Sequence, residues 1–321
     1  GRSDLLSAAP GQALVVRCST TGTGRYVQVK DKMPSLLGTY ARLLLIRRRG
    51  LRVGEHLPRL HIECRSLCFE PRKIAAYRRV CGLDKTESVP LLYPQVLLMP
   101  LHMRLVSDGR MPVQPVGLVH VRNHVQRYHA MPVGQKVDLR CRILGERRTA
   151  QGLEFDIGSE VWHAGALCWQ AISTYLARGD YLHGQAPAAL PGRASWALLP
   201  ASCPAASWAV PVNIGWRFAR VSADFNPIHL WAPAARACGF PRAFAHGMWS
   251  LARSLAGQAL PVRVRLDVQF KAPLLLGSQV LQEHSQVGAC RQWRLLAADT
   301  QRPLLLAQLQ HGPVQALNLT G

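Results

Sequence analysis

The stretch FARVSADFNPIHLWAPAARACGFPRAFAHGMW, residues 218–249, is the most informative part of this chain. It places an acid, Asp224, five residues before a histidine, His229, with Asn226-Pro227 between them. Proline fixes its own φ and disfavours helical geometry in the residue before it, so this loop should be stiff. Asn226 can hold the loop through hydrogen bonds from its side chain to the backbone. A carboxylate and an imidazole on one short rigid loop can orient a water molecule and act as general base and general acid.

Two interpretations of this loop remain open. An Asx-type turn followed by a surface histidine would show the same Asp-x-Asn-Pro pattern. The downstream Gly239-Phe240-Pro241 and His246-Gly247-Met248 favour a functional site instead. Ser222 can hydrogen-bond within the loop or support His229, although it can also be an ordinary turn serine.

A helix is predicted over residues 246–256, because Met248, Leu251, Ala252 and Leu255 recur at the spacing of a buried helix face. Gly247 lies at its start, where backbone N–H groups and the helix dipole can meet a substrate carbonyl closely. An amide in such a position often stabilises a developing oxyanion by about 3 kcal/mol. Gly247 can also be an ordinary helix entry selected for close packing. We expect His246 to be a structural, hydrogen-bonded histidine rather than a catalyst.

Several side chains near this loop can line a substrate pocket, although core packing is the alternative for each apolar one. The candidate substrate-binding residues are Phe240, Phe244, His246, Met248 and Trp249. Arg220, Arg242 and Arg253 are close in sequence and can either meet substrate phosphates or lie in solvent.

The composition limits the class of protein. With 321 residues the chain can form two domains, and 48% hydrophobic residues exclude general disorder. The net charge of +21 and the pI near 10.5 favour anionic partners such as nucleic acid, a lipid surface or phosphate-bearing small molecules. The densest basic run is only Arg47 to Arg49, and there is no basic tail. A solvated basic surface or a phosphate-docking patch therefore fits better than a nucleic-acid interface.

The cysteines and the apolar segments indicate a soluble cytoplasmic protein. The nine cysteines have no regular spacing, and no second pair follows Cys64 and Cys68 to complete a zinc site. We therefore expect reduced thiols and no metal. Residues 1–12 lack the pattern of a secretion signal. The longest uncharged stretch, residues 194–216, contains three prolines and cannot form a continuous membrane helix.

An Ala- and Pro-rich segment at 184–207 breaks the hydrophobic periodicity and is predicted to be a linker. It would separate an N-terminal lobe at 14–183 from a C-terminal lobe at 208–321. Three weak similarities at nearly one offset predict that the lobes are diverged copies. These pair Arg79-Val80-Cys81-Gly82 with Arg220-Val221-Ser222-Ala223, His102 with His246, and Gly134 with Gly277.

Each lobe is predicted to have one helix followed by several strands. The strand candidates are 115–128, 137–144, 153–157 and 161–175 in the first lobe, and 262–270, 280–287, 292–298 and 304–309 in the second. One helix against a mostly antiparallel sheet, present twice, is an α+β architecture.

The residues Val221 to His229, Gly239-Phe-Pro241 and Ala245-His-Gly-Met248 together resemble the MaoC-like (R)-specific enoyl-CoA hydratase/dehydratase family. The clear match covers about 208–290, and the first lobe resembles only loosely the degenerate half of double hot-dog hydratases. The resemblance implies a double hot-dog fold, in which each lobe wraps an antiparallel sheet around a long central helix. It also implies action on trans-2-enoyl thioesters or their (3R)-hydroxyacyl products, without metal or redox cofactor.

Carried over to this chain, the resemblance makes Asp224 and His229 the catalytic dyad and the Gly247 amide the oxyanion donor. The supporting loop residues would be Ser222, Asn226 and Pro227. The first lobe has no Asn-Pro-x-His after Gly82, so one active site per chain is expected, with the first lobe providing acyl-chain room. Two positions depart from the family pattern. Ala223 stands where the family usually has Gly before the Asp, and Trp231 stands where it commonly has an acidic residue.

The expected function is therefore reversible hydration of trans-2-enoyl thioesters of CoA, or of acyl-carrier protein, by a carbon–oxygen lyase. A hot-dog acyl-thioesterase is the nearest alternative enzyme. A non-catalytic acyl-CoA or nucleic-acid binding protein is the alternative from another class. Association into a homodimer is left open.

Overall fold

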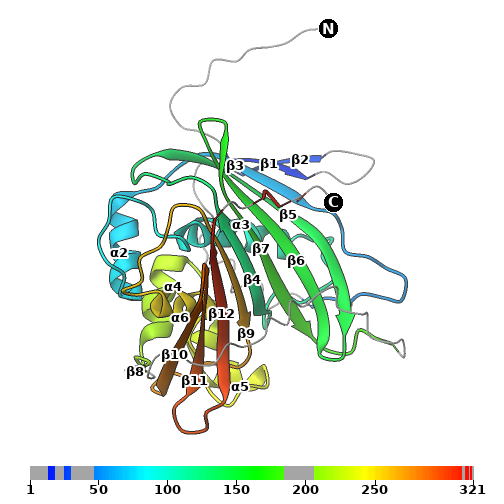
Figure 1. The fold of residues 1–321 in the computed structure, drawn as a ribbon. Coiled ribbons are helices and arrows are strands. Elements are labelled where there is room, and N and C mark those ends of the chain that lie inside the picture. Colours follow the sequence, from blue (N-terminus) through cyan, green and yellow to red (C-terminus); the bar gives the residue numbers. More distant parts are fainter. Residues whose placement is uncertain are drawn as a thin grey trace.

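A single antiparallel sheet of ten strands forms the frame of the computed structural model, in the order β3-β5-β6-β7-β4-β9-β12-β11-β10-β8 (Figure 1). The structure describes residues 47–183, 206–312, 315–317 and 319, together with the backbone of two further strands at 14–18 and 25–29. These two, β1 (Leu14–Cys18) and β2 (Arg25–Val29), pair with each other in a separate antiparallel sheet.

The N-terminal half of the large sheet encloses a helix of 14 residues, α3 (Tyr93–Val106). The strands of this half are β3 (His61–Cys68), β4 (Val119–Arg127), β5 (Lys136–Thr149), β6 (Gly152–His163) and β7 (Ala166–Arg178). A shorter helix, α2 (Pro71–Cys81), precedes α3. Buried side chains alternate along β5 over residues 136–144, which is the period of a strand that buries one face.

The C-terminal half repeats the arrangement around α6 (Gly247–Ser254). Its strands are β8 (Ala206–Ala209), β9 (Val264–Phe270), β10 (Gln279–Val287), β11 (Cys290–Ala297) and β12 (Pro303–His311). Between β8 and α6 lie α4 (Ile214–Ser222), a 3-10 turn η1 (Pro227–His229) and α5 (Ala232–Ala237).

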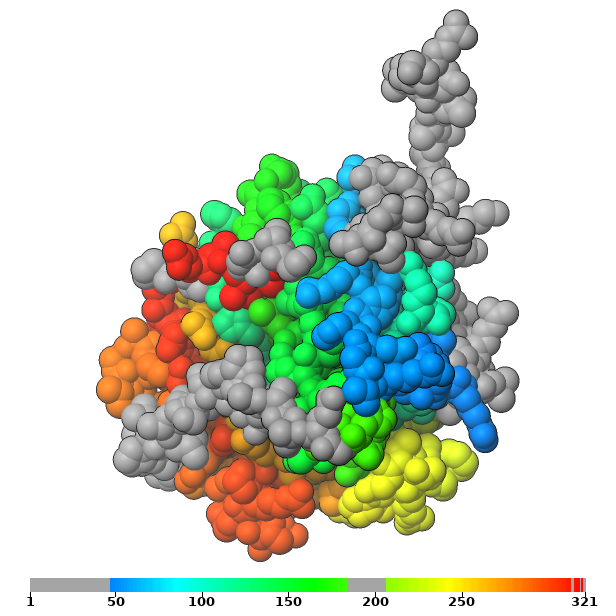
Figure 2. Space-filling model, turned by 90° about the vertical axis from the view of Figure 1, so that its right-hand side faces the viewer, coloured from blue at the N-terminus to red at the C-terminus, as the bar shows by residue number. Residues whose placement is uncertain are grey.

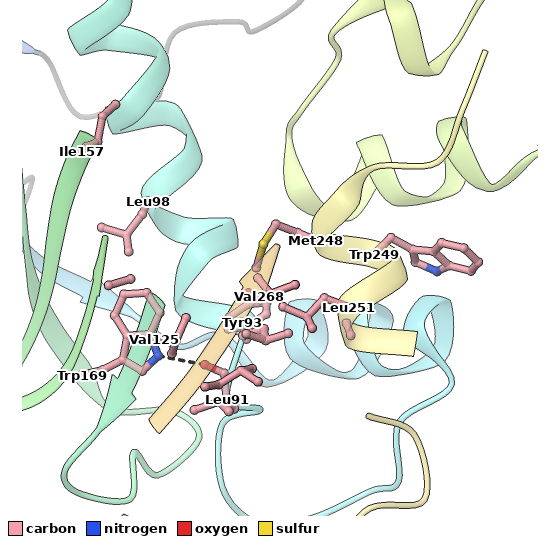
Figure 3. Close-up of a cluster of buried hydrophobic side chains, with 14 of the residues drawn as sticks. Leu91, Tyr93, Leu98, Val125, Ile157, Trp169, Met248, Trp249, Leu251 and Val268 are labelled. Atoms are coloured by element: carbon pink, nitrogen blue, oxygen red, sulfur yellow. Dashed lines mark hydrogen bonds between the residues drawn. The ribbon is translucent and has the colours of Figure 1, made fainter. Parts of the chain in front are cut away.

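The two halves join where β4 pairs with β9, from Arg122 opposite Gln269 to Arg127 opposite Val264. The core residues of both halves form one hydrophobic cluster. In this cluster the Trp169 indole N–H donates a hydrogen bond of 2.9 Å to the Leu91 carbonyl (Figure 3). Two helices, each wrapped by half of a continuous antiparallel sheet, confirm the predicted α+β double hot-dog fold.

The order of elements agrees with the predicted duplication. Helices α2 and α4 both end in a residue with left-handed backbone, Gly82 at φ 68° and Ala223 at φ 59°, and these are the residues that the sequence comparison paired. The two histidines that the sequence comparison paired, His102 and His246, differ in their place on the helix. His246 precedes the first residue of α6, whereas His102 lies inside α3, because α3 is the longer helix and begins nine residues before it.

Three other expectations need correction. The single strand predicted at 161–175 is two strands, because Ala164 (φ 48°) and Gly165 (φ 80°) form a tight turn between β6 and β7. In each lobe one strand of the large sheet, β3 or β8, comes before the helices, and more than one helix precedes the remaining strands. Residues 184–205 of the predicted linker lie outside the described residues, and 206–207 already belong to β8, so the lobe boundaries stay a prediction.

Residues near the C-terminus lie on the N-terminal half of the sheet, where Figure 2 shows red atoms beside green ones. Gln170 exchanges two hydrogen bonds with the backbone of Leu317, at 2.9 and 3.2 Å, and Arg142 donates to the Leu319 carbonyl. The cysteines whose side chains are described are all free thiols. Among the described residues, no helix is long and apolar enough to cross a membrane.

Candidate active site

The Asp224 loop begins where α4 ends, and local hydrogen bonds hold it. Ala223 turns the chain with its left-handed backbone, and the Asp224 N–H then donates to Ser222 Oγ at 3.2 Å. The Asn226 N–H donates to Asp224 Oδ1 at 3.1 Å. Asn226 Oδ1 accepts from the Ile228 N–H at 3.5 Å and starts the turn η1 with Pro227. These bonds agree with the predicted stiff loop.

His229 is buried at the end of this loop with a defined tautomer. Its Nδ1 lies 2.9 Å from the Phe244 carbonyl oxygen, which can only accept, so Nδ1 carries the proton and donates. Burial lowers the pKa of His229 to about 3, with a further contribution from nearby His246, so the ring is neutral at physiological pH. The Nε2 atom therefore has a free lone pair and can accept a proton.

His246 connects the Asp224 loop to helix α6. Its Nε2–H donates to the Asp224 carbonyl at 2.9 Å, and the same atom lies 3.8 Å from Asp224 Oδ2. Its ring centroid is 3.9 Å from that of His229, with an interplanar angle of 33°. Burial lowers the pKa of His246 as well. These contacts agree with the expectation of a structural histidine, placed where it can hold Asp224 and His229 together.

Gly247 begins α6 immediately after His246, and its N–H points out of the helix start. Within the described ranges, no backbone carbonyl accepts a hydrogen bond from this N–H. A Cβ at this position would lie 2.9 Å from Phe270 Cε1, closer than real Cβ atoms approach. Only glycine therefore lets the Phe270 ring and the helix start share this space.

A cavity of about 500 Å³ brings these groups together between the two lobes. Of the predicted site residues, those that line it are Ser222, Asp224, Asn226, His229, Phe240, Phe244, His246, Gly247 and Met248. Pro227 shapes the loop without reaching the cavity wall. The carboxylate and the two imidazoles each present an atom within 4.8 Å of the others.

The expectation that Trp249 lines the pocket was wrong. One residue along a helix turns the side chain by about 100°, so Met248 and Trp249 point in different directions from α6 (Figure 3). The Trp249 ring packs edge-on against Trp208, and its N–H donates to the Val80 carbonyl at 2.9 Å. With an exposed fraction of 2%, Trp249 is part of the core between the lobes.

The basic residues that line the cavity differ from the three arginines that the sequence suggested for contact with substrate phosphates. Arg220 and Arg242 are exposed away from the cavity, and Arg253 lies over the Trp208 ring at 5.6 Å. Exposed Arg178, Lys271 and Arg302 line it instead. Arg178 lies over the Phe240 ring at 5.1 Å.

The N-terminal lobe adds polar residues to the cavity wall that the sequence analysis missed: Gln95, His102, His120 and Tyr175. The first lobe matches the family only loosely, so no motif marks these positions. The loop after α2 that corresponds to the Asp224 loop lacks a dyad. The buried Arg78 holds it through the carbonyls of Asp84, Thr86 and Ser88 and the Thr86 hydroxyl.

Asp224, His229 and His246 are residue types that can ligate a metal ion. Both rings, however, already donate an N–H to a backbone carbonyl, and this fixes their orientation. These two hydrogen bonds help to keep the shape of the cluster. That the site uses no metal or other cofactor stays a prediction.

Comparison with known proteins identifies the family. A model of the MaoC like domain matches residues 210–302. The 3-hydroxyacyl-thioester dehydratase X of Mycobacterium tuberculosis is 33% identical over 224 residues, which cover 69% of this chain and 79% of that protein. The (R)-specific enoyl-CoA hydratase of Aeromonas caviae is 37% identical over 91 residues, covering 26% of this chain and 67% of that protein.

Solved structures agree with the sequence comparisons. The crystal structure of HtdX of Mycobacterium tuberculosis superimposes with a TM-score of 0.69 at 28% identity, covering 78% of this chain and 98% of that one. A MaoC-like dehydratase of Phytophthora capsici shares the fold with a TM-score of 0.65 at 17% identity, over 82% and 98% of the two chains. The chain belongs to the MaoC-like dehydratase family of enzymes.

Proposed function

We propose that this enzyme adds water to trans-2-enoyl thioesters to form (3R)-3-hydroxyacyl thioesters, and catalyses the reverse dehydration. One observation carries the proposal. The Asp224 carboxylate, the unprotonated Nε2 side of His229 and the helix-start amide of Gly247 belong to one cavity wall. The names of the two curated relatives, a 3-hydroxyacyl-thioester dehydratase and an (R)-specific enoyl-CoA hydratase, support the same reaction.

In the hydration direction the Gly247 N–H binds the thioester oxygen and stabilises the negative charge that develops on it. Electron density leaves the double bond, so the β-carbon becomes electrophilic. Asp224 and His229 hold one water molecule between them, and His229 Nε2 can accept its proton. The hydroxyl adds to the β-carbon and the proton to the α-carbon, so that one water is consumed for each double bond.

The position of the dyad on one loop supports a single product configuration. Asp224 and His229 come from one loop and therefore face the substrate from one side. Water delivered to only one face of the double bond gives a single enantiomer, and the name of the Aeromonas relative supports the (R) form. The basic side chains of Arg178, Lys271 and Arg302 fit a carrier that bears phosphate groups, such as CoA or acyl-carrier protein.

The test is hydration of trans-2-enoyl-CoA, followed by loss of the conjugated enoyl absorbance, with chiral analysis of the product. We expect Asp224→Asn and His229→Gln each to lower kcat by about 100-fold or more, as for loss of a general acid or base. His284→Gln is the matched control, because His284 lies on β10 and stacks on Trp293 away from the cavity. Losses below tenfold in both dyad variants would show that this assignment of the dyad is wrong.

Two other outcomes would replace the proposal. Release of free CoA, detected with a thiol reagent, without loss of the enoyl group would indicate a thioesterase. Saturable binding of enoyl-CoA without turnover would indicate a binding protein.

A further inference from the structure

We propose that the N-terminal half of the cavity contains a subsite for a hydroxyl group on the acyl chain, formed by Gln95 and His120. The inference rests on the proposed function, since it assumes that an acyl chain enters this cavity. It adds a substrate class: acyl thioesters that carry a hydroxyl beyond the reacting carbons. The argument depends on two buried side-chain atoms that lack a hydrogen-bond partner.

The first acceptor is Gln95 Oε1, and a chain of hydrogen bonds defines its orientation. Asn123 Nδ2 donates to the Met248 sulfur at 3.4 Å, so Asn123 Oδ1 faces Ser173. The Ser173 hydroxyl must then give its only proton to Asn123 Oδ1, at 3.3 Å. Ser173 Oγ can therefore only accept from Gln95, whose Nε2 lies 3.2 Å away. Gln95 Oε1 is left buried without a hydrogen-bond partner, on a side chain with an exposed fraction of 2%.

The second atom is His120 Nε2, which is also buried without a partner. Burial lowers the pKa of His120 to about 4, so the ring is neutral at physiological pH and carries one N–H. When that N–H is on Nε2, it can donate to a hydroxyl oxygen.

The backbone directs His120 to this place. The pairing of β4 with β7 shifts register between His120 and Arg122, which leaves Val121 as an extra residue. Bulges of this kind re-aim side chains and are frequent beside active sites. His120 then stacks on Tyr175, with centroids 4.9 Å apart at 23°, and lies 5.2 Å from the Phe270 ring.

Gln95 and His120 belong to one patch of the cavity wall. Gln95 is hydrogen-bonded to Ser173, and His120 is stacked on Tyr175. Ser173 and Tyr175 are alternate residues of β7, so they lie about 7 Å apart on the same face of the sheet. The patch is also next to the reacting centre. Asn123 touches Met248, the residue after Gly247, and Phe270 contacts both His120 and the space beside Gly247.

The chemistry of the patch favours a hydroxyl group. A buried acceptor without a donor is costly, and Gln95 Oε1 can only accept, so neither a carboxylate nor a keto oxygen can satisfy it. A hydroxyl donates its proton to Gln95 Oε1, and its oxygen can accept from the His120 Nε2–H. It also suits the otherwise apolar wall, to which Val96, Met99 and Leu118 contribute. Because the patch lies beside the reacting centre, the hydroxyl should be within the first few carbons beyond C3.

Binding of saturated acyl-CoA tests the subsite without chemistry. Octanoyl-CoA and its 4-, 5- and 6-hydroxy isomers would be titrated into the enzyme by calorimetry. One isomer should bind about tenfold more tightly than octanoyl-CoA, as expected for one well-placed hydrogen bond to a buried acceptor. Equal or weaker binding of all three isomers would overturn the inference.

Variants assign the effect to the patch. Gln95→Met and His120→Phe keep the side-chain size and remove one hydrogen-bonding group each, the acceptor Gln95 Oε1 and the His120 imidazole. Either should therefore lower the preference for the hydroxylated ligand to about threefold or less. Met99→Leu is the control, since Met99 lies one turn after Gln95 on α3 and lines the same cavity with an apolar side chain. The control should keep the full preference. A preference that survives in both Gln95→Met and His120→Phe would place the hydroxyl elsewhere and refute the subsite.

Turnover separates this inference from the proposed function. If trans-2-octenoyl-CoA is hydrated but no hydroxylated ligand is preferred, the subsite is wrong and the proposed reaction stands. If a hydroxylated acyl-CoA binds preferentially but no enoyl-CoA is hydrated, the subsite stands and the reaction is wrong.

Discussion

Replacing Gly215 with alanine should displace His229 without altering any residue of the cavity. Gly215 lies in the first turn of α4, and a Cβ there would be 2.0 Å from the His229 carbonyl oxygen. Ordinary contact begins at 3.4 Å, so the helix and the loop must separate by about 1.4 Å. The His229 backbone cannot yield alone, because its N–H donates to the Asn226 carbonyl and its ring donates to the Phe244 carbonyl.

The magnitude of the effect follows from this displacement. A misplacement of about 1 Å in a catalytic group can lower a rate by about 100-fold, so we expect a loss of that size in kcat. The stability should change less. Overpacking costs about 1–3 kcal/mol, whereas alanine is favoured over glycine inside a helix by about 1 kcal/mol. The free energy of unfolding should therefore fall by no more than about 2 kcal/mol.

The assay is hydration of trans-2-enoyl-CoA together with urea denaturation of the same samples. Gly145→Ala is the control, because a Cβ at Gly145 would have no neighbour within 4 Å and its backbone is not left-handed. It should keep both the rate and the stability. If Gly215→Ala keeps kcat within threefold of the wild type, α4 does not set the position of His229 and the reasoning is refuted.

The remaining predictions concern stability. Ala223→Gly should raise the free energy of unfolding by about 0.5–1 kcal/mol, because relief of left-handed strain of about 1–2 kcal/mol exceeds the entropy that glycine adds to the unfolded chain. Gly82→Ala makes the reverse change at φ 68° in the first lobe and should lower the free energy of unfolding by a similar amount. Both variants would be measured by urea denaturation, and a shift of both in the same direction would contradict this account. The pKa values of His102 and His229 are lowered to about 3 and that of His120 to about 4, from 6.5. As the pH falls from 6.5 toward 4, the unfolded chain therefore binds more protons than the folded one. The free energy of unfolding is highest above pH 6.5 and falls below it. For three protons the fall is up to about 4 kcal/mol per pH unit. Denaturation at several pH values should show this slope, and His120→Phe should reduce it by about one proton; an unchanged slope would show that His120 titrates normally in the folded chain.

The Asp224 loop could be predicted from the sequence because its geometry is local. The proline, the Asx hydrogen bonds and the glycine at the helix start act over a few residues, and the structure has the turn and the helix where they were expected. The alternation of β5 and β9 shows in the sequence for a similar reason, since period 2 follows from the strand itself.

Contacts between the lobes could not be predicted, since periodicity shows that a face is buried but not what covers it. Trp249 is an aromatic residue of the kind that lines pockets, but it lies in the core, because its N–H donates to the Val80 carbonyl in the other lobe. His120 reaches the cavity through a bulge that depends on the pairing of β4 with β7. The sequence alone determined the local chemistry of one loop and the class of the fold. Only the tertiary structure decided which side chains from the first lobe face that loop, because those neighbours are set by strand pairing and packing over more than a hundred residues of chain.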